Sequence, residues 1–461
     1  MPSQELLQDL IAVVGEANVR TDQESRIAYG TDALKRGHPA DAVVSPGNTS
    51  EVARVVKVCA SHGIPFVPRG GGTGYTGGAV PIHGGIVISL ERMNRIIEID
   101  EANLIAVVEP NVITGDLQEA VENVGLFYPP DPSSLKQSAI GGNVAECAGG
   151  PRAFKYGTTK QYVLGLEAVL PTGEVIETGG KVVKNVVGYD LTHLLVGSEG
   201  TLAIITRIIL RLVPKPQLQA TLRAAFADVE SAVLAVSEIV RHRVVPASLE
   251  LVDGESLEAV ARAQGVRSLA PEGTAALLLI EVDGTPSAVS EEAARVEEAC
   301  RAAAAIEILR ARDDAERQEL WRVRREISLS LRTIDALKFN HDVVVPKGRI
   351  PELFALVARI REAYQLRIPC FGHAGDGNIH VNIMVSPDDA GEVQRAHDAE
   401  RVLFEGVVAL EGSISGEHGI GFSKAPFLPI ELSPDEIALM KRVKQAFDPH
   451  NLLNPGKIFP S

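Results

Sequence analysis

Residues 64–78 read IPFVPRGGGTGYTGG, and this stretch decides how the first half of the chain is interpreted. Eight of its last ten residues are Gly or Thr, a composition unsuited to helix or strand because Gly loses the most backbone entropy on ordering. Such a run can bring backbone amides close to anionic oxygens, and Arg69 at its start adds a positive charge that suits a phosphate. We therefore expect a phosphate cradle here; a glycine-rich surface turn is the alternative.

The Gly run contains a literal G-x-G-x-x-G at Gly72, Gly74 and Gly77. A Rossmann domain needs a strand before this motif and a helix after it. Residues 64–67 can form the strand, but proline and glycine follow the motif, and the apolar run 86–90 then indicates a second strand. The pattern predicts a strand–Gly loop–strand unit and disfavours a nicotinamide-binding Rossmann domain.

Composition limits the classes of protein that this chain can belong to. Its 461 residues suffice for two or three domains, and its 45% hydrophobic content is typical of a globular protein. The net charge of −15 disfavours nucleic-acid binding as the main function, because nucleic-acid-binding proteins usually carry a basic face. An anionic substrate would need a locally positive site inside this acidic protein.

The cysteines and the N-terminus bear on the cellular compartment. Cys59, Cys147, Cys300 and Cys370 include no CxxC pair, which disfavours a zinc knuckle or an iron–sulfur site and is consistent with a reducing compartment. The N-terminus lacks the basic region of a secretory signal, and no apolar run approaches the ~18 residues of a membrane span. We expect a soluble, cytoplasmic protein without a transmembrane segment, and peripheral membrane docking is left open.

Hydrophobic periodicity predicts the order of the elements. We expect two short helices in residues 1–35, and later a helix capped by Thr49 or Ser50. Further strands are expected at 104–108, 163–170, 174–178, 202–212, 219–226, 247–252, 275–282 and 338–345, and further helices at 114–124, 228–242, 254–263, 286–304, 314–333 and 351–364. The alternation from residue 217 to about 310 predicts an α+β domain with an antiparallel sheet. Residues 126–157 show little periodicity, and a loop of that length inside a domain is usually functional or disordered.

The Gly run resembles a flavin-binding motif, and seven further motifs strengthen the likeness. Beyond VPRGGGTGYTGGA (67–79) they are PPDPSS (129–134), IGGNVAECAGG (140–150), YG (156–157), GSEGTLAIIT (197–206), GHAGDGNIHVN (372–382), SGEHGIG (415–421) and NPGK (454–457). In this order they resemble the FAD-linked D-2-hydroxyacid dehydrogenase branch of the vanillyl-alcohol oxidase superfamily. That branch contains D-lactate dehydrogenases, D-2-hydroxyglutarate dehydrogenases and the flavin subunit of bacterial glycolate oxidase.

The resemblance implies a fold and a division into domains. The fold class is α+β, with a two-part FAD-binding domain of the p-cresol methylhydroxylase (PCMH) type and an α+β cap, or substrate, domain with an antiparallel sheet. We expect an N-terminal helical lead-in at 1–35, the FAD-binding domain at 36–215, the cap at 216–410, and a C-terminal segment, 411–461, that returns to the FAD domain.

The resemblance also implies the residues that bind FAD, and it makes residues 126–157 part of the flavin site. The implied contacts are Arg69, Gly70, Gly71, Gly72, Thr73, Gly74, Pro130, Asp131, Ser134, Gly141, Gly142, Asn143, Ala145, Gly149, Tyr156, Gly157, Gly200, Ile204 and Asn454. Some members of the superfamily attach FAD covalently through His or Cys. The Gly run contains neither, so we expect noncovalent FAD, and Cys147 is the residue that keeps a covalent link open.

His373 and His380 flank the tripeptide GDG, which signals a turn that can bring both imidazoles together. A pair of histidines with a carboxylate can bind a divalent metal. The carboxylate that we choose is Glu417, in the glycine-flanked loop SGEHGIG, and zinc or manganese would suit these ligands. The alternative is that each histidine is an ordinary hydrogen-bonded side chain.

The resemblance assigns catalytic roles to three further residues. His418 matches the base that takes the substrate hydroxyl proton, a role that suits an imidazole. Arg324 matches a carboxylate-binding arginine, and Lys338 matches a second cation. Arg324 could instead be a solvated helix charge. Ser328, one turn after Arg324, could bind a substrate oxygen, although an ordinary structural role is the stronger interpretation.

These predictions favour FAD-dependent oxidation of a small anionic D-2-hydroxy acid, of the glycolate or D-lactate type, to the 2-oxo acid. The alternatives are a D-2-hydroxyglutarate dehydrogenase, the flavin subunit of a multi-subunit glycolate oxidase, an alkyl-ether synthase-type flavoenzyme, and a non-catalytic subunit that only holds FAD. The electron acceptor or partner redox subunit is not readable from the sequence, and a homodimer is left open.

Overall fold

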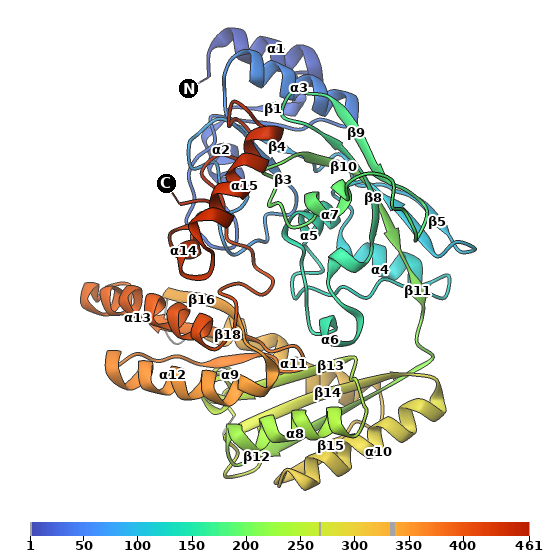
Figure 1. Cartoon of the computed structure of the whole chain (residues 1–461), viewed down its shortest axis with the longest axis vertical. Coiled ribbons are helices and arrows are strands. Elements are labelled where there is room, and N and C mark those ends of the chain that lie inside the picture. Colours follow the sequence, from blue (N-terminus) through green and yellow to red (C-terminus); the bar gives the residue numbers. More distant parts are fainter. Residues whose placement is uncertain (1, 267–268, 332–336, 461) are drawn as a thin grey trace. The chain divides into compact units, whose positions relative to one another are not determined.

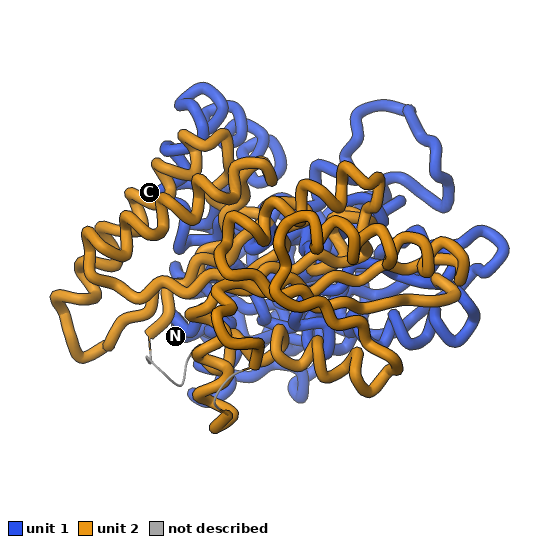
Figure 2. The backbone as a smooth tube through the Cα atoms, turned by 90° about the horizontal axis from the view of Figure 1, so that it is seen from below, with its two compact units in different colours: residues 1–149, 158–215, 417–461 blue, residues 150–157, 216–416 orange. Residues whose placement is uncertain are grey.

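The computed structural model describes residues 2–266, 269–331 and 337–460, and the chain divides into two compact units. Figure 2 shows unit 1, residues 1–149, 158–215 and 417–461, in blue, and unit 2, residues 150–157 and 216–416, in orange. The chain therefore leaves unit 1 twice and returns to it twice. Residues 332–333 of the predicted helix 314–333 lie outside the described residues.

The first sheet of unit 1 contains the two strands that the Gly run connects. Its strand order is β1-β2-β4-β3, and β3 and β4 run parallel, so the Gly run lies in the connection between two parallel neighbours. The strands are β1 (Val19–Arg20), β2 (Ala42–Val44), β3 (Phe66–Arg69) and β4 (Ile86–Ser89), and the helices are α1 (Gln4–Val14), η1 (Glu16–Asn18), α2 (Gln23–Tyr29) and α3 (Thr49–Ser61). The predicted strand–Gly loop–strand unit is confirmed. The helices α1 and α3 pack side by side against this sheet (Figure 1).

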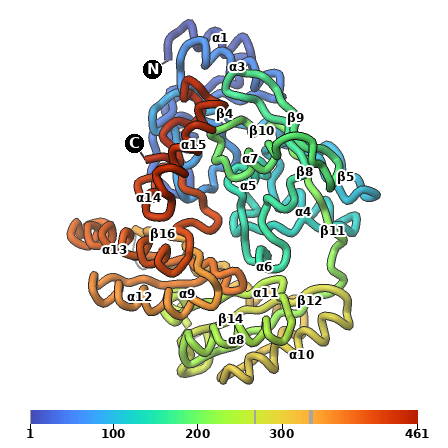
Figure 3. The backbone as a smooth tube through the Cα atoms, in the orientation of Figure 1, coloured from blue at the N-terminus to red at the C-terminus, as the bar shows by residue number. Residues whose placement is uncertain are grey.

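The second sheet of unit 1 is antiparallel, in the order β5-β6-β10-β8-β9. Its strands are β5 (Ile96–Asp100), β6 (Ile105–Val108), β8 (Val163–Val169), β9 (Val175–Gly179) and β10 (Ile204–Arg211), and β7 (Leu126–Phe127) pairs with β11 (Val213–Pro214). The remaining helices of unit 1 are α4 (Thr114–Glu122), α5 (Ile140–Glu146), η2 (Thr159–Gln161), α7 (Leu191–Leu195), η4 (Ala425–Phe427), α14 (Leu428–Glu431) and α15 (Pro434–Phe447). Figure 3 shows the C-terminal helices, in red, beside the first sheet, and Leu453 forms a bridge with Phe66 of β3.

Unit 2 is built on one seven-stranded sheet in the order β15-β12-β14-β13-β17-β18-β16, with every neighbouring pair antiparallel. The strands are β12 (Leu218–Phe226), β13 (Ser248–Asp253), β14 (Ala276–Gly284), β15 (Glu307–Arg310), β16 (Leu337–Val344), β17 (Cys370–His373) and β18 (Asn378–Val385). The helices are α6 (Ala153–Tyr156), α8 (Val229–Arg241), α9 (Gly254–Gln264), α10 (Pro286–Ala302), α11 (Asp314–Leu331), η3 (Lys347–Arg349), α12 (Ile350–Tyr364) and α13 (Ala390–Ala409). The predicted antiparallel sheet and the α+β class are confirmed.

The structure corrects several local predictions. The N-cap of α3 is Asn48, whose side chain accepts the Glu51 amide, rather than Thr49 or Ser50, because Asn48 is the residue with extended backbone. The region 126–157, which lacked periodicity, contains the short helices α5 and α6. The small residues of α5 hide its helical pattern, and the four residues of α6 are too few to show one. The elements that were not predicted also include β1, β5, β7, β11, β15, β17, α7, α13, α14 and α15.

The strand register gives the sheet of unit 2 a polar stripe on one face. Glu250 of β13 lies opposite His373 of β17, and Asp342 of β16 lies opposite His380 of β18. Residues that pair in register point to the same side, and alternate residues of a strand do so too. Lys338 is four residues before Asp342 and therefore shares its face. The sheet thus gathers charged and imidazole side chains from four strands on one surface.

Candidate active site

Some glycines of the Gly run lie against neighbouring atoms of unit 1, whereas others border open space. A Cβ on Gly71 would lie 2.4 Å from the Gln137 carbonyl oxygen, and one on Gly72, where φ is +65°, would lie 2.2 Å from the Arg69 guanidinium. A Cβ on Gly74 would find its nearest neighbour at 3.9 Å, and one on Gly142 would meet no atom within 4 Å. The two glycine motifs of unit 1 therefore leave room beside the backbone, as a cradle for a cofactor requires.

The Arg69 side chain binds the backbone at Tyr29 and Thr31, near the start of the Gly run. Its guanidinium donates to the carbonyl oxygens of Thr31 at 2.8 Å and Tyr29 at 3.3 Å, and it lies over the Tyr29 ring at 5.6 Å. Burial lowers the pKa of Arg69, and the nearby Asp32 carboxylate opposes this effect. Since Arg69 also occupies the space beside Gly72, its contacts explain why that position excludes a side chain.

Two asparagines of the predicted flavin set form hydrogen bonds that connect loops of unit 1. Asn143 is buried and donates to the Thr114 hydroxyl at 2.7 Å. Asn454 is buried and donates to the carbonyl oxygens of Gly78 and Glu199, each at 2.9 Å. The C-terminal NPGK motif thereby ties the end of the Gly run to the GSEG turn.

Most other predicted flavin residues lie in the same loops of unit 1. The Pro130 carbonyl accepts from Gln118, and the Ser134 carbonyl accepts from two later amides of its own turn. Ile204 is buried in the core below the first sheet, and a Cβ on Gly200 would lie 2.8 Å from Pro68. The rest are distributed over the Gly run (Gly70, Thr73), the 129–134 turn (Asp131), and the α5 region (Gly141, Ala145, Gly149).

Tyr156 and Gly157 belong to unit 2. The Tyr156 hydroxyl donates to the Asp283 carboxylate at 2.7 Å, and Lys155 pairs with the same carboxylate at 2.5 Å. Gly157 ends α6 with φ of +81°. The YG motif therefore ends a short segment that is anchored on β14.

The loop that carries His418 is held through its own backbone groups, which bind side chains of other loops in unit 1. The Tyr75 ring stacks on His418, with centroids 5.1 Å apart, and the Thr76 hydroxyl donates to the His418 carbonyl at 3.1 Å. The next two amides, of Ile420 and Gly421, donate to the Glu199 carboxylate at 2.7 and 2.6 Å. The position of His418 is thus set on both sides, by the Gly run and by Glu199.

Glu199 is a buried carboxylate that the sequence analysis did not single out. Its backbone φ is +52°, and a Cβ on Gly419 would lie 3.0 Å from its carboxylate and 2.4 Å from that of Glu146. Burial raises the pKa of Glu199, while the two amides and nearby lysines, Lys424 and Lys457, oppose this effect. The usable signal was an acidic residue within the glycine turn GSEGT, which was interpreted only as a turn.

Unit 2 contains a buried chain of charges centred on Glu250. The Arg324 Nε donates to Glu250 Oε2 at 2.6 Å, and His373 Nδ1 lies 2.5 Å from Glu250 Oε1. The Glu250 side chain is fully buried; burial would raise its pKa, but His373 and Arg324 outweigh burial and lower it to about 2. The sequence analysis missed Glu250, although a single acid in the apolar strand SLELV was a visible signal.

The Arg324 guanidinium has a hydrogen-bond donor that is not used within the described residues. Its side chain is buried, it lies over the Phe371 ring at 4.7 Å, and its terminal nitrogen Nη2 has no hydrogen-bond partner among the described residues. This rejects the interpretation of Arg324 as a solvated helix charge. A buried guanidinium nitrogen without a partner is costly, and a ligand oxygen would satisfy it. Lys338 Nζ donates to the Ser328 hydroxyl of α11 at 2.8 Å, so these two predicted residues are neighbours.

His373 and His380 face each other across the hairpin of β17 and β18. Their ring centroids are 5.3 Å apart and the rings are nearly perpendicular, at 82°. The Gly416 amide donates to Asp342 at 2.9 Å, and Asp342 lies opposite His380 in the sheet. Glu417 follows Gly416 directly in the chain. Two buried imidazoles that face each other across a hairpin are ligands of the kind that divalent metals use.

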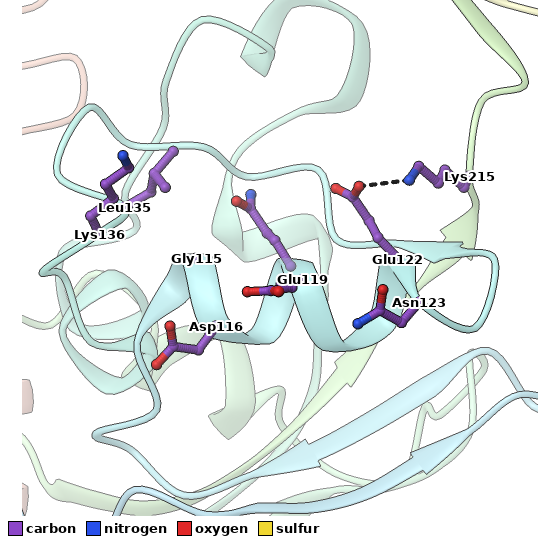
Figure 4. A pocket seen from close by; sticks show the side chains of 9 residues that line it. Gly115, Asp116, Glu119, Glu122, Asn123, Leu135, Lys136 and Lys215 are labelled. Atoms are coloured by element: carbon purple, nitrogen blue, oxygen red, sulfur yellow. Dashed lines mark ion pairs between the residues drawn. The ribbon is translucent and has the colours of Figure 1, made fainter.

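A separate surface pocket of about 600 Å³ lies along α4 in unit 1 (Figure 4). Its wall carries Asp116, Glu119 and Glu122, together with Lys136 and Lys215. Glu122 and Lys215 form an ion pair at 2.8 Å. The pocket contains none of the predicted site residues, and its charges are those of an ordinary solvated helix face.

Comparisons with known proteins identify two family domains along the chain. The family described as "FAD binding domain" matches residues 40–179, and the family "FAD linked oxidases, C-terminal domain" matches residues 215–458. The glycolate oxidase subunit GlcD of Bacillus subtilis (strain 168) is 42% identical over 460 residues, which cover 100% of this chain and 97% of that protein. A D-lactate dehydrogenase of Archaeoglobus fulgidus is 39% identical over 418 residues, or 90% of each chain.

Solved structures show the same fold at low sequence identity. A substrate-bound p-cresol methylhydroxylase superposes with a TM-score of 0.82 at 19% identity, covering 98% of this chain and 96% of that one. A 4-ethylphenol oxidase from Gulosibacter chungangensis gives 0.80 at 20% identity, covering 99% and 97%. The chain therefore belongs to the FAD-linked oxidase family, within the PCMH and vanillyl-alcohol oxidase group of flavoproteins.

Proposed function

We propose that this protein is an FAD-linked dehydrogenase or oxidase that converts a small D-2-hydroxy acid, of the glycolate or D-lactate type, to the 2-oxo acid. The observation that carries the proposal is the buried Arg324, whose Nη2 lacks a partner among the described residues and whose Nε is held by Glu250. A guanidinium held in this way is prepared to bind a carboxylate. The names of the relatives, glycolate oxidase subunit and D-lactate dehydrogenase, support the same class of substrate.

The cofactor is FAD, held noncovalently by the Gly run and the α5 loops of unit 1. When bound, FAD would supply the acceptor for the substrate hydride. The open space beside Gly74 and Gly142 supports this role. Cys147, the residue that kept a covalent link open, has its sulfur 3.4 Å from the Thr158 hydroxyl. We propose that it stays a free thiol.

The substrate carboxylate is bound by Arg324, with Lys338 as a second cation and Ser328 beside it. Glu250 holds the Arg324 Nε, which leaves the terminal nitrogens for the ligand. Lys338 is oriented by Ser328 at 2.8 Å. Two cations with different partners would discriminate an anionic 2-hydroxy acid from a neutral alcohol.

His418 removes the proton of the substrate hydroxyl. Its ring is stacked on Tyr75, and its backbone is held by Thr76, so the imidazole is presented in one orientation. The proposed ligands of a divalent metal, zinc or manganese, are His373, His380 and Glu417. When bound, such an ion would lower the pKa of a coordinated hydroxyl. Glu250 holds Nδ1 of His373, which directs the other ring nitrogen toward a ligand.

A second candidate is the flavin subunit of a multi-subunit glycolate oxidase, because the relative that is 42% identical carries the word subunit in its name. A D-2-hydroxyglutarate dehydrogenase or an alkyl-ether synthase-type flavoenzyme has no specific observation in its favour. We further propose a cytoplasmic location and the domain limits 1–35, 36–215, 216–410 and 411–461. No helix of the described residues is long and apolar enough to span a membrane.

An anaerobic screen of 2-hydroxy acids tests the proposed function. The FAD-loaded protein is mixed with glycolate, D-lactate, L-lactate and D-2-hydroxyglutarate, and the bleaching of the flavin absorbance is followed. We expect a D-2-hydroxy acid to reduce the flavin. In the variant Arg324→Met, the substrate concentration that gives the half-maximal rate of flavin reduction should rise strongly. The variant Arg325→Met, at the neighbouring exposed position, is the matched control. Flavin that no 2-hydroxy acid reduces would refute the proposal.

A further inference from the structure

The most exposed apolar side chains of unit 1 lie together in one loop that the proposed function does not use. The loop, residues 182–189, joins β9 to α7, as Figure 3 shows, and we call it the apolar loop. Val186, Val187 and Tyr189 are exposed by 96%, 90% and 94%, and Val183 by 73%. A cluster of this kind usually marks a contact with another surface.

The apolar loop is held in shape at its base and at its tip. The Asn185 side chain accepts the amide of Val187 at 3.1 Å, which forms a turn that directs the valines outward. After the loop, Asp190 caps α7 by accepting the His193 amide at 3.0 Å, and Thr192 donates to Thr178 of β9 at 2.9 Å. The side chains are therefore presented on a supported turn, which limits the entropy lost on docking.

The apolar loop itself is positively charged, whereas the whole chain has a net charge of −15. Lys184 lies in the loop and Lys181 precedes it, no acidic residue occurs from position 181 to 189, and Asp190 follows directly. Lys181 pairs with Glu98, and Lys184 is exposed. An exposed lysine in a loop of exposed apolar side chains suits a surface with negative headgroups over an apolar layer.

We propose that the apolar loop docks the protein on an anionic lipid surface, with Val186, Val187 and Tyr189 entering the headgroup layer and Lys184 meeting lipid phosphates. The almost complete exposure of Val186, Val187 and Tyr189 favours lipid over a protein partner, because a bilayer can surround exposed side chains whereas a protein must offer a matching recess. The proposal goes beyond the oxidation reaction. It would bring the dehydrogenase to a membrane, where lipid-soluble electron acceptors reside.

Vesicle sedimentation of the full-length, FAD-loaded protein tests this proposal. The vesicles are phosphatidylcholine alone or phosphatidylcholine mixed with phosphatidylglycerol. We expect binding to the mixed vesicles that weakens as salt rises, and a loss of affinity of roughly tenfold or more in the double variant Val186→Ser, Val187→Ser. The double variant Leu439→Ser, Met440→Ser is the matched control, because it removes two adjacent exposed apolar residues of unit 1 from α15 and should bind like the wild type.

Two further measurements separate lipid docking from other contacts. A Tyr189→Trp variant should shift its fluorescence to shorter wavelength on the mixed vesicles, and Lys184→Glu should weaken binding to them. Flavin reduction by the 2-hydroxy acid, with a soluble dye as acceptor, should be unchanged in all these variants. Wild-type protein that stays in the supernatant, or a serine double variant that sediments equally well, would overturn the proposal. So would a double variant that changes only the oligomeric state, since the loop would then be an interface between proteins.

Discussion

The candidate functional residues of unit 1 and those of unit 2 are held in place in different ways. In unit 1 the backbone of the His418 loop is bound by the Thr76 hydroxyl of the Gly run and by the Glu199 carboxylate of the GSEG turn. Gly72 and Glu199 also have positive φ, so the course of these loops depends on their backbone conformation. In unit 2 the site consists of long charged side chains, Arg324, Glu250 and His373, placed on a regular antiparallel sheet. Unit 1 therefore presents an arrangement that a bulky residue would block, and unit 2 presents one that a lost charge would break.

The largest effect is expected at the Gly run. The change Gly72→Val should abolish retention of FAD, because a side chain there meets the Arg69 guanidinium at a position with φ of +65°. Gel filtration followed by the ratio of flavin to protein absorbance measures it. Gly63→Val is the control, since Gly63 also has positive φ but has no atom within 4 Å of an added Cβ. A Gly72→Val protein with full flavin content would contradict the role of the Gly run.

The second prediction separates flavin binding from catalysis. The variant His418→Ala should retain FAD. Reduction of that FAD by the substrate should be about 10²- to 10⁴-fold slower than in the wild type, because a general base is lost. His380→Ala, or treatment with a chelator, should also keep FAD and stop rapid reduction, and only His380→Ala and the chelator should lower the metal content. Stopped-flow absorbance and metal analysis of the active protein check both parts. Active protein without a divalent ion would remove His373, His380 and Glu417 as ligands and leave His418 as an ordinary base.

The third prediction concerns the charged chain of unit 2. Glu250→Ala leaves the buried charge of Arg324 without its partner and should lower the free energy of unfolding by ~3–5 kcal/mol. Denaturant titration measures this. Glu177→Ala, which breaks a surface pair with Arg207, should change it by only ~0–1 kcal/mol. Equal effects in both variants would mean that the buried pair of Glu250 and Arg324 contributes no more to the free energy of unfolding than a surface pair does.

The fourth prediction concerns how the Glu250 carboxylate makes the stability of the fold depend on pH. Folding lowers the pKa of Glu250 from its ordinary 4.5 to about 2, so its contribution to stability is complete above pH 4.5 and is lost as the pH falls towards 2. The stability of the wild type should therefore fall more steeply between these values than that of Glu250→Gln.

The smallest effect is expected at Glu199. Glu199→Gln keeps one good acceptor for the amides of Ile420 and Gly421 but loses the second, and His418 becomes less well oriented. Flavin reduction should slow by about 10- to 100-fold while the flavin content and the substrate concentration at half-saturation stay near the wild type. Loss of FAD together with activity would assign Glu199 to the fold of unit 1 rather than to the position of His418.

Much of the fold could be predicted because its signals are local. The apolar strands around the Gly run and the alternating elements from residue 217 were identified from periodicity, and the antiparallel sheet of unit 2 followed from them. The helices α5 and α6 were not, because the glycines and the alanine of α5 give no periodic pattern and α6 has only four residues. The N-cap of α3 depended on which of three adjacent polar residues takes the extended backbone, and only the folded chain decides that.

The sequence by itself determined the residue types of the site: a glycine run with an arginine, two histidines around a tight turn, and His418 in a glycine-flanked loop. These signals survive without a structure because backbone conformation is dictated by nearby residues. Only the tertiary structure revealed Glu250, which joins Arg324 across 74 positions and His373 across 123, and Glu199, which joins the loop of His418 across more than 200. Charge pairing acts through space, and strand register, not sequence distance, decides which charges meet.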